Sequence, residues 1–382
     1  MTPRPPCYAP RAAPAVPRWK RWAQVGLLVL LAWAGCLALL WPAAPPRRGW
    51  WLLALLGPLL LVLGLSLRLW LFQLARLRHA RYQQVLAATR ARWWHWRSLG
   101  LPLEQVLLLG PAGEGQQAYQ GCMAATAVPS PVAAGGAPAL RCPLGTVSGE
   151  GRAAWLGARL ARRVLALPGL EARWPRLRAL AWGGCPASHA AFAAVLQAAG
   201  LRLPAMQLPL QAPADLCTLI DLLHYRYDAP QAWLLCAGVV SVAPAGAAPG
   251  MAGEAAFAWV ASRAGQHQVH RAEVLAAAPG DSAASLCAQV QRYLRPAALP
   301  AAALALGSPA AQALRAAGWP LGNHELGRYW GELQHCAPFV ALSLAWLQAA
   351  QTEAPCGWAS HGMDQHIVIG MAGPYGNANT EN

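Results

Sequence analysis

A histidine and a cysteine lie side by side where a buried helix is predicted to begin. In YWGELQHCAPFVALSLAWLQAA, residues 329–350, His335 and Cys336 follow a glycine-led turn and precede an apolar run. Thiol-dependent acyl transfer uses this pair of groups, the imidazole as base and the thiolate as nucleophile. Adjacent helical residues point about 100° apart, so the two side chains are not expected to face each other as a dyad.

A second candidate nucleophile is Cys217, in APADLCTLIDLLHYRY, residues 212–227. This stretch is predicted to be a helix with an aspartate at its N-cap. The chain has ten cysteines, none of which forms a CxxC pair or a Cys/His pair at zinc spacing. Several lie inside apolar runs, which predicts free, buried thiols in a reducing compartment.

Three further motifs favour ordinary structure over chemistry. GPAGEGQQAY, residues 110–119, lacks the Lys-Ser/Thr of a phosphate loop and the third glycine of a dinucleotide fingerprint, so a turn is predicted. His267 and His270 are expected to be exposed histidines of a strand. The stretch HYRYD, residues 224–228, is interpreted as a helix end.

SHGMDQH, residues 360–366, brings together His361, Asp364 and His366 and could bind a metal ion. No other acidic residue is close in the sequence, so a loop is the favoured interpretation. We therefore expect neither a metal site nor a cofactor.

From residue 101 onwards, strand patterns alternate with helix patterns, which predicts an α/β domain with a central sheet. Strands are predicted at 103–111, 176–184, 232–242, 253–263, 268–277, near 302–306 and at 366–371, and helices at 151–167, 187–200, 212–227, near 281–294 and in the opening stretch. Residues 127–140 and 243–252 are rich in Ala, Gly and Pro and look like linkers, and the tail at 373–382 is expected to be flexible.

Two uncharged apolar runs precede this domain, at 22–41 and within 50–72. Each is about as long as a bilayer core is thick, and the short link between them predicts a transmembrane hairpin. A cleaved signal peptide is the alternative for the first run, but its apolar core is too long. Basic residues dominate 1–21 and the predicted juxtamembrane helix at 73–100, so both termini are expected in the cytoplasm. The tryptophan cluster 93–96 either docks a partner or packs on headgroups or on the domain surface.

Composition supports a membrane protein and argues against nucleic-acid binding. Hydrophobic residues make up 56% of the 382 residues and charged residues only 12%. The net charge is +15, but residues 1–100 hold 14 basic and no acidic residues, which leaves the large domain nearly neutral. A nucleic-acid footprint would belong on the folded domain.

Three stretches of the second half resemble the thiolase-like superfamily, such as the β-ketoacyl synthases. They are YDAPQAWLLCAGVVSV, PGMAGEAAFAWVASR, and GELQHCAPFVALSLAWLQAA followed by GWASHGMDQHIVIG. The resemblance implies a two-repeat αβαβα domain over residues 101–372. It also implies a cysteine nucleophile at a helix N-terminus and two carbonyl-polarising side chains.

This chain departs from the family at all three catalytic positions. The nucleophile should fall at 212–215, which holds no cysteine, and the first histidine should fall in LGSPAAQ, which offers Ser308. The second histidine position, after the turn glycine, is Glu332, and Pro338 replaces a small glycine of the family helix. A carboxylate at 332 would oppose formation of an oxyanion.

The expected function is therefore that of a non-catalytic adapter anchored in a bacterial inner membrane, with a protein partner and no nucleic acid. Its architecture is similar to that of the type VI secretion lipase adapters, which load a phospholipase effector onto the secretion machinery. A slipped alignment with the family would make Cys217 the nucleophile and His335 the base. The alternative function is therefore a membrane-tethered condensing enzyme or acyltransferase that acts on acyl-thioesters through Cys217. Another is a structural subunit of a membrane complex.

Overall fold

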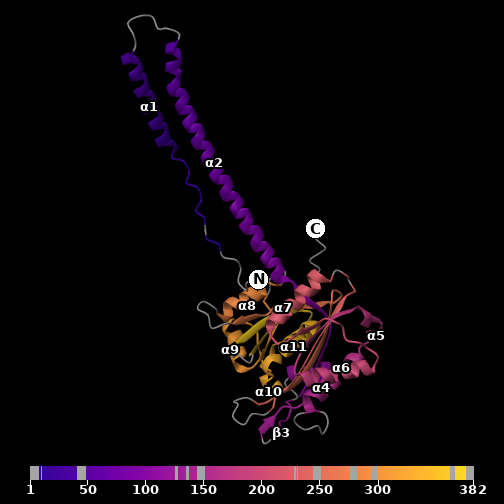
Figure 1. Ribbon diagram of the computed structural model, residues 1–382. Coiled ribbons are helices and arrows are strands. Elements are labelled where there is room, and N and C mark those ends of the chain that lie inside the picture. The colour runs from indigo at the N-terminus through magenta and orange to yellow at the C-terminus, as the bar shows by residue number, and fades with distance from the viewer. Residues whose placement is uncertain are drawn as a thin grey trace. The chain divides into compact units, whose positions relative to one another are not determined.

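The computed structural model describes most of the chain (Figure 1). The described residues are 8–9, 11–40, 49–124, 128–134, 137–143, 151–227, 229, 231–243, 251–275, 282–294, 299–361 and 366–375. The chain divides into two compact units, Met1–Trp94 and His95–Asn382.

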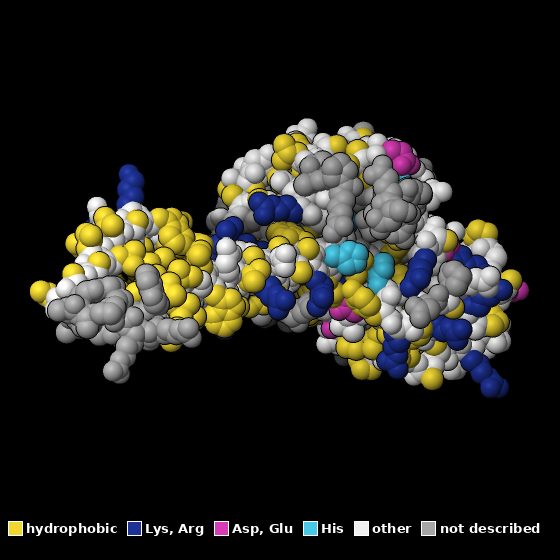
Figure 2. Space-filling model, turned by 90° about the horizontal axis from the view of Figure 1, so that it is seen from above, with side chains coloured by type: hydrophobic (Ala, Val, Ile, Leu, Met, Phe, Trp, Pro, Cys, Tyr) yellow, Lys and Arg dark blue, Asp and Glu magenta, His cyan; other side chains and the backbone are white. Residues whose placement is uncertain are grey.

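The first unit consists of α1, Trp19–Leu40, and α2, Gly49–Ser98, whose C-terminal end belongs to the second unit. Both helices are long and apolar enough to cross a membrane, and hydrophobic side chains cover the lobe that they form (Figure 2). The helices run antiparallel, with the Trp33 ring packed on Gly57, where a Cβ atom would come within 2.6 Å of the ring.

The second apolar run and the predicted juxtamembrane helix form one continuous helix, α2. Residues 69–92 are rich in leucine, alanine, arginine and glutamine, which are strong helix formers, so nothing in the sequence ends the helix after the apolar run. Pro58 lies inside α2. Within an apolar helix pair, neighbouring groups can satisfy the carbonyl that a proline frees.

The second unit is built on a mixed sheet that contains two halves of similar connectivity (Figure 1). The first half holds β1 Gly100–Gly110, β5 Leu177–Gly183, β6 Gln207–Pro209, β7 Trp233–Ser241 and β8 Glu254–Ser262, in the order β6-β5-β7-β8-β1. The second half holds β9 His267–His270, β11 Ala302–Leu306, β12 Cys356–His361 and β13 Ile367–Pro374, in the order β11-β12-β13-β9. In the first half β6, β5 and β7 are parallel, and in the second half β11 and β12 are parallel. The next two pairings of each half are antiparallel.

The two halves are joined where β1 pairs antiparallel with β9, from Gly100 opposite His270 to Leu103 opposite His267. At the far edge of the second half, a single parallel bridge joins Ala305 to Glu325. This bridge lies where the first half has its full edge strand, β6. Three short pairings complete the described sheets: β2 Gly113–Glu114 on β1, β10 Glu273–Leu275 on β13, and the separate hairpin of β3 Val132–Ala134 with β4 Ala137–Ala139.

Helices cover both faces of the sheet. Helices α4 Arg152–Leu165 and α6 Pro186–Ala198 pack on the first half, α8 Ala283–Gln291 and α9 Ser308–Ala316 pack on the second, and α11 Ala337–Thr352 contacts strands of both halves. The remaining described α-helices are α3 Gly115–Met123, α5 Leu170–Arg173, α7 Pro213–Asp221 and α10 Gly327–Trp330. Figure 1 shows α11 in the interior of the unit, between the layers.

Two hydrophobic cores result, one on each face of the first half-sheet. Along β7, Leu234 and Cys236 belong to the core shared with α11, whereas Leu235 and Ala237 belong to the core under α4 and α6. Successive side chains of a strand point to opposite faces, so a strand buried on both faces must be apolar at every position. This explains why WLLCAGVV shows no alternation of polar and apolar residues.

The structure corrects several sequence-based predictions. Asp215 is not an N-cap: α7 begins at Pro213, and the Asp215 carboxylate accepts the backbone N–H groups of Gln211 and Ala212 from the third helical position. After α7 the chain widens into a π-helical turn, Leu222–Arg226. The strand predicted at 268–277 is divided between β9 and β10, and the linker predicted at 127–140 contains the β3–β4 hairpin.

Candidate functional site

A groove of about 990 Å³ opens in the second unit where several loops meet. Its lining comes from the segments around 128–131, 140, 251, 306–309, 315, 322–328, 331–333, 337 and 361. One part is apolar, with Val128, Pro129 and Met251, and another is polar. The groove therefore combines apolar surface with a few charged groups, as binding sites usually do.

One wall of the groove is fixed by three chain segments that lie side by side. The N–H of Leu140 donates to the carbonyl oxygen of Ala252 at 2.8 Å. The N–H of Glu332 donates to the carbonyl oxygen of Met251, also at 2.8 Å. A bond of 3.1 Å from the N–H of Gly253 to the carbonyl oxygen of Glu332 completes the pairing. The backbone of Glu332 is thus held as in a parallel ladder, and its exposed side chain lines the groove.

Two glycines make this close approach possible. A Cβ atom on Gly253 would lie 2.0 Å from the carbonyl oxygen of Trp330, which no side chain can accommodate without a backbone shift. Gly331 has φ +66°, a left-handed conformation that glycine adopts at little cost, and its Cβ position lies 2.6 Å from the carbonyl oxygen of Met251. The glycine before Glu332 is therefore required by geometry.

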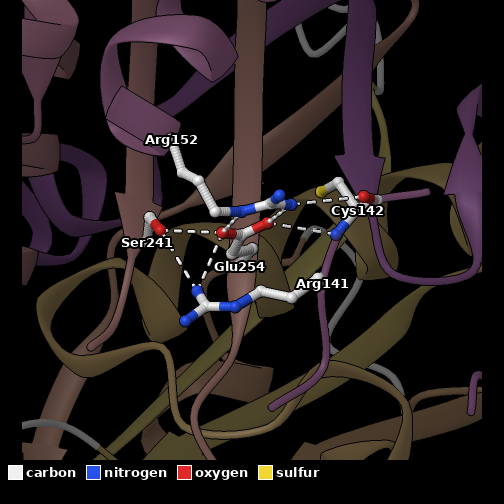
Figure 3. Close-up of polar contacts among 5 residues, drawn as sticks. All are labelled: Arg141, Cys142, Arg152, Ser241 and Glu254. Carbon is white, nitrogen blue, oxygen red and sulfur yellow. Dashed lines mark hydrogen bonds and ion pairs between the residues drawn. The ribbon is translucent and has the colours of Figure 1, made fainter. Parts of the chain in front are cut away.

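Behind this wall, a buried ion-pair network holds the segment that contains Leu140. The Glu254 carboxylate accepts from Arg152 at 2.5 and 2.7 Å and from Arg141 at 2.8 Å. It also accepts from the Ser241 hydroxyl at 2.8 Å and from the backbone N–H of Cys142 at 3.1 Å. Figure 3 shows both guanidinium groups converging on this carboxylate.

The charge of Glu254 is well compensated. Burial alone would raise the pKa of this carboxyl, but the hydrogen bonds from Arg152, Ser241 and the Cys142 amide together hold it below its ordinary value. The network is a structural support of the groove wall, and it leaves little capacity for binding a ligand.

The polar part of the groove contains one ion pair and several separate charged groups. Arg315 donates to Glu325 at 3.0 Å, and the Ser308 hydroxyl donates to the same carboxylate at 3.1 Å. Arg328 lies over the ring of its neighbour Tyr329 and also lines the groove. Among the described residues, no hydrogen bond or ion pair engages the Glu332 side chain.

The sequence-derived candidates Cys217, His335 and Cys336 do not meet in this groove. Cys217 is half-buried on α7, and the Arg271 guanidinium donates to its carbonyl oxygen at 3.3 Å. His335 and Cys336 lie in a 3₁₀ turn, Gln334–Cys336, before α11, and neither lines the groove. Within the described part of the chain, no hydrogen bond joins a cysteine sulfur to a histidine ring.

Burial makes Cys336 a poor nucleophile. Its side chain is fully buried, which raises the pKa of the thiol to about 12. Burial also lowers the pKa of His335, which keeps that ring neutral at physiological pH. The cysteines that the structure describes are all free.

The predicted exposed strand histidines are in fact buried, and this prediction was wrong. Strand β9 lies between β1 and β13, so His267 is only 6% exposed and His270 not at all. His267 contacts the carboxylate of Glu353 at 3.2 Å. Position in the sheet decides this burial, which a local pattern does not reveal.

Among the residues that the structure describes, the remaining motifs do not come together as a second site. The stretch 110–119 forms a turn, the short strand β2 and most of α3. His361 lies at the end of β12 and lines the groove, whereas its predicted companion Asp364 lies outside the described residues. No group of three or more potential metal ligands occurs among the residues that the structure describes.

Several groove residues were not singled out from the sequence. Arg328 and Glu325 lie in a stretch with no helix or strand pattern, and Val128 and Pro129 lie in a presumed linker. The sequence offered one signal for these two residues. A flexible linker rarely needs apolar side chains such as valine, so Val128 next to Pro129 suggested an ordered segment. Trp96 packs on the unit itself, since its Nε1 donates to Asp221 at 2.9 Å and its ring lies 4.0 Å from the Arg271 guanidinium carbon.

No protein-family model and no curated protein matches the sequence. Solved structures do match. The ketosynthase from module 1 of the bacillaene synthase from Bacillus amyloliquefaciens FZB42 superposes with a TM-score of 0.51 at 9% identity, covering 74% of this chain and 77% of that chain. The ketosynthase from module 6 of the bacillaene synthase from Bacillus subtilis 168 gives 0.50 at 10% identity, covering 72% and 70%.

At such low identity the likeness shows the fold alone. The second unit has the mixed α/β fold of thiolase-like proteins, which confirms the predicted fold class. The two long apolar helices that precede it are consistent with the predicted hairpin.

Proposed function

We propose that this protein is a non-catalytic adapter, anchored in a bacterial inner membrane, which holds a protein partner in the groove of its thiolase-like unit. The observation that carries the proposal is the lining of that groove. Where the family resemblance places two carbonyl-polarising side chains, the lining offers Ser308 and Glu332. It contains no cysteine among the described residues, and His361 is its one imidazole.

The chemistry of these groups does not suit acyl transfer. The reaction needs a thiolate nucleophile and donors that stabilise a developing oxyanion. The carboxylate of Glu332 would repel that negative charge. A wide groove of mixed polarity suits a segment of another protein, which can fill apolar and charged subsites together.

The two candidate spans would determine where in the cell the adapter is located. Two spans with arginine-rich flanks would put both termini, and the thiolase-like unit, in the cytoplasm. The architecture is similar to that of the type VI secretion lipase adapters, so a secreted phospholipase effector is the partner we propose.

The competing function is a membrane-tethered condensing enzyme or acyltransferase. One observation favours it: Cys217 is half-buried on α7, two to five residues beyond the position of the family nucleophile. Exposing the full chain in detergent micelles to an acyl-CoA, followed by peptide mass spectrometry, separates the two functions. We expect no acyl adduct on Cys217. A stoichiometric thioester there, absent from Cys217→Ser, would establish the enzyme.

Partner binding is tested by co-purification of the full chain with a candidate phospholipase effector. We expect Glu332→Arg to reduce recovery of the partner, because it reverses the charge of a groove side chain that has no described counter-ion. The matched control is Glu171→Arg, the same change at an exposed residue of α5 outside the groove. Equal recovery with both variants would exclude the groove as the binding surface.

A further inference from the structure

One side of helix α2 carries a stripe of apolar and basic side chains. Its members are spaced so that they fall within about 100° of the helix circumference. This surface, the basic stripe, consists of Leu77, Arg78, Arg81, Val85, Ala88 and Arg92, all of which are exposed. Leu77 is 59% exposed and Val85 is 65% exposed, and both lie beyond the apolar run of the helix, where no bilayer core would cover them.

The N-terminal segment of the chain packs along a different side of α2. The hydroxyl of Tyr82 donates to the carbonyl oxygen of Ala9 at 2.9 Å, and the guanidinium of Arg11 lies 5.8 Å from the ring of Tyr82. Tyr82 is displaced by about 90° around the helix from the centre of the basic stripe. The segment that covers Tyr82 therefore leaves the stripe open.

The net positive charge of this region favours an acidic binding partner. Residues 1–100 contain no acidic residue, so the first unit cannot neutralise its own arginines. Among the described residues, Arg78, Arg81 and Arg92 have no ion pair with a carboxylate. A second copy of the stripe would bring arginine against arginine, which disfavours self-association through this surface.

Lipid headgroups lie too far away to serve the outer part of the stripe, around Arg92. The predicted second span ends by residue 72. At 1.5 Å per residue, Arg81 and Arg92 lie roughly 14 and 30 Å further along the helix. The polar layer of a bilayer adds only about 5 to 7 Å on each side, and the Debye length is about 8 Å at physiological salt.

We propose that the basic stripe of α2 docks an acidic amphipathic helix of a partner protein. Glutamate or aspartate side chains of that helix pair with Arg81 and Arg92, and its apolar side chains cover Leu77 and Val85. The exposed apolar pair favours a protein over a nucleic acid, because a duplex offers phosphates but no apolar face at this spacing. This inference is independent of the groove and of the function proposed for it.

The test uses the full chain in nanodiscs of zwitterionic phosphatidylcholine. The probe is a fluorescent synthetic helical peptide of leucine and glutamate heptads, and its lysine counterpart is the negative control. We expect Arg81→Glu/Arg92→Glu to weaken binding about tenfold, since two attractive exposed pairs become repulsive. The matched control is Arg76→Glu/Arg90→Glu, the same charge change on the opposite side of α2, and we expect it to change affinity less than threefold.

Val85→Ser tests the apolar contact separately, because it removes that contact without changing the charge. We expect this variant to weaken binding as well. Absence of binding by the acidic peptide would overturn the proposal. So would equal weakening by the two double variants, which indicates diffuse attraction. Tighter binding of a DNA duplex, or binding to phosphatidylglycerol nanodiscs that depends on Arg81 and Arg92, would assign the stripe to another class of partner.

Discussion

Glu254 and Arg152 form a bidentate ion pair in the interior of the thiolase-like unit. The Nε atom of Arg152 lies 2.5 Å from Oε1 of Glu254, and its Nη2 atom lies 2.7 Å from Oε2. Glu254 is the first residue of β8 and Arg152 the first of α4, so the pair joins helix to sheet. Because Arg141 shares the carboxylate, the same pair also fixes the segment that leads into the groove wall.

Glu254→Gln should destabilise the unit at neutral pH. The substitution keeps the shape of the side chain but leaves two buried guanidinium groups without a counter-charge, which typically costs about 3 kcal/mol. Urea unfolding of the full chain in detergent, followed by tryptophan fluorescence, measures the change. The control Glu171→Gln alters an exposed carboxylate that has no described partner and should leave the midpoint unchanged.

The loss in free energy of unfolding caused by Glu254→Gln should also depend on pH. The pKa of Glu254 in the folded protein lies below its ordinary value, so the ion pair stabilises the fold above pH about 4.5. That stability is lost as pH falls through the folded pKa. Wild type and variant should therefore converge at acidic pH, and a difference that stays constant down to pH 3 would contradict the assignment.

His270 should make the unit sensitive to mild acid. Complete burial lowers the pKa of its ring to about 4, whereas the unfolded chain has a histidine pKa near 6.5. Between these values the unfolded state binds more protons, so stability should fall by about 3 kcal/mol as pH drops from 6.5 to 4. His270→Leu should remove much of this slope in thermal unfolding, and an unchanged slope would show that other groups cause it.

Gly253→Ala should disturb the groove wall more than its size suggests. The added methyl group would lie 2.0 Å from the carbonyl oxygen of Trp330, so the ladder between residues 251–253 and Glu332 must shift. We expect a lower melting temperature and faster amide exchange at Glu332, measured by hydrogen–deuterium exchange. Gly64→Ala is the control, because its methyl group would meet nothing within 4 Å and should leave both readouts unchanged.

Trp96→Ala should loosen the start of the second unit. It removes a hydrogen bond to Asp221 and a guanidinium–ring contact with Arg271, and it leaves a buried guanidinium less well covered. A loss of about 3 kcal/mol in the free energy of unfolding is typical for removing a packed aromatic ring. Trp96→Phe keeps a ring over Arg271 and should recover part of that loss; if it does not, the hydrogen bond dominates.

Local patterns predicted the elements that local physics controls. The apolar runs of α1 and α2 were evident from length and charge, and β7 and β11 lie within a residue of the predicted bounds. The predictions failed where contacts with distant parts of the chain determine the structure. His270 is buried because β9 lies between two other strands, and α7 ends early in a π turn. Strand β12 was missed because CGWASH carries no alternating pattern.

The sequence by itself determined the two long apolar helices and the α/β class, because each depends on residue types along a short stretch. Only the tertiary structure decided that Glu332 borders a groove and that Cys217 and His335 do not. Groove and network join residues that are far apart in the chain, such as Leu140, Ala252 and Glu332, and no local periodicity encodes such contacts.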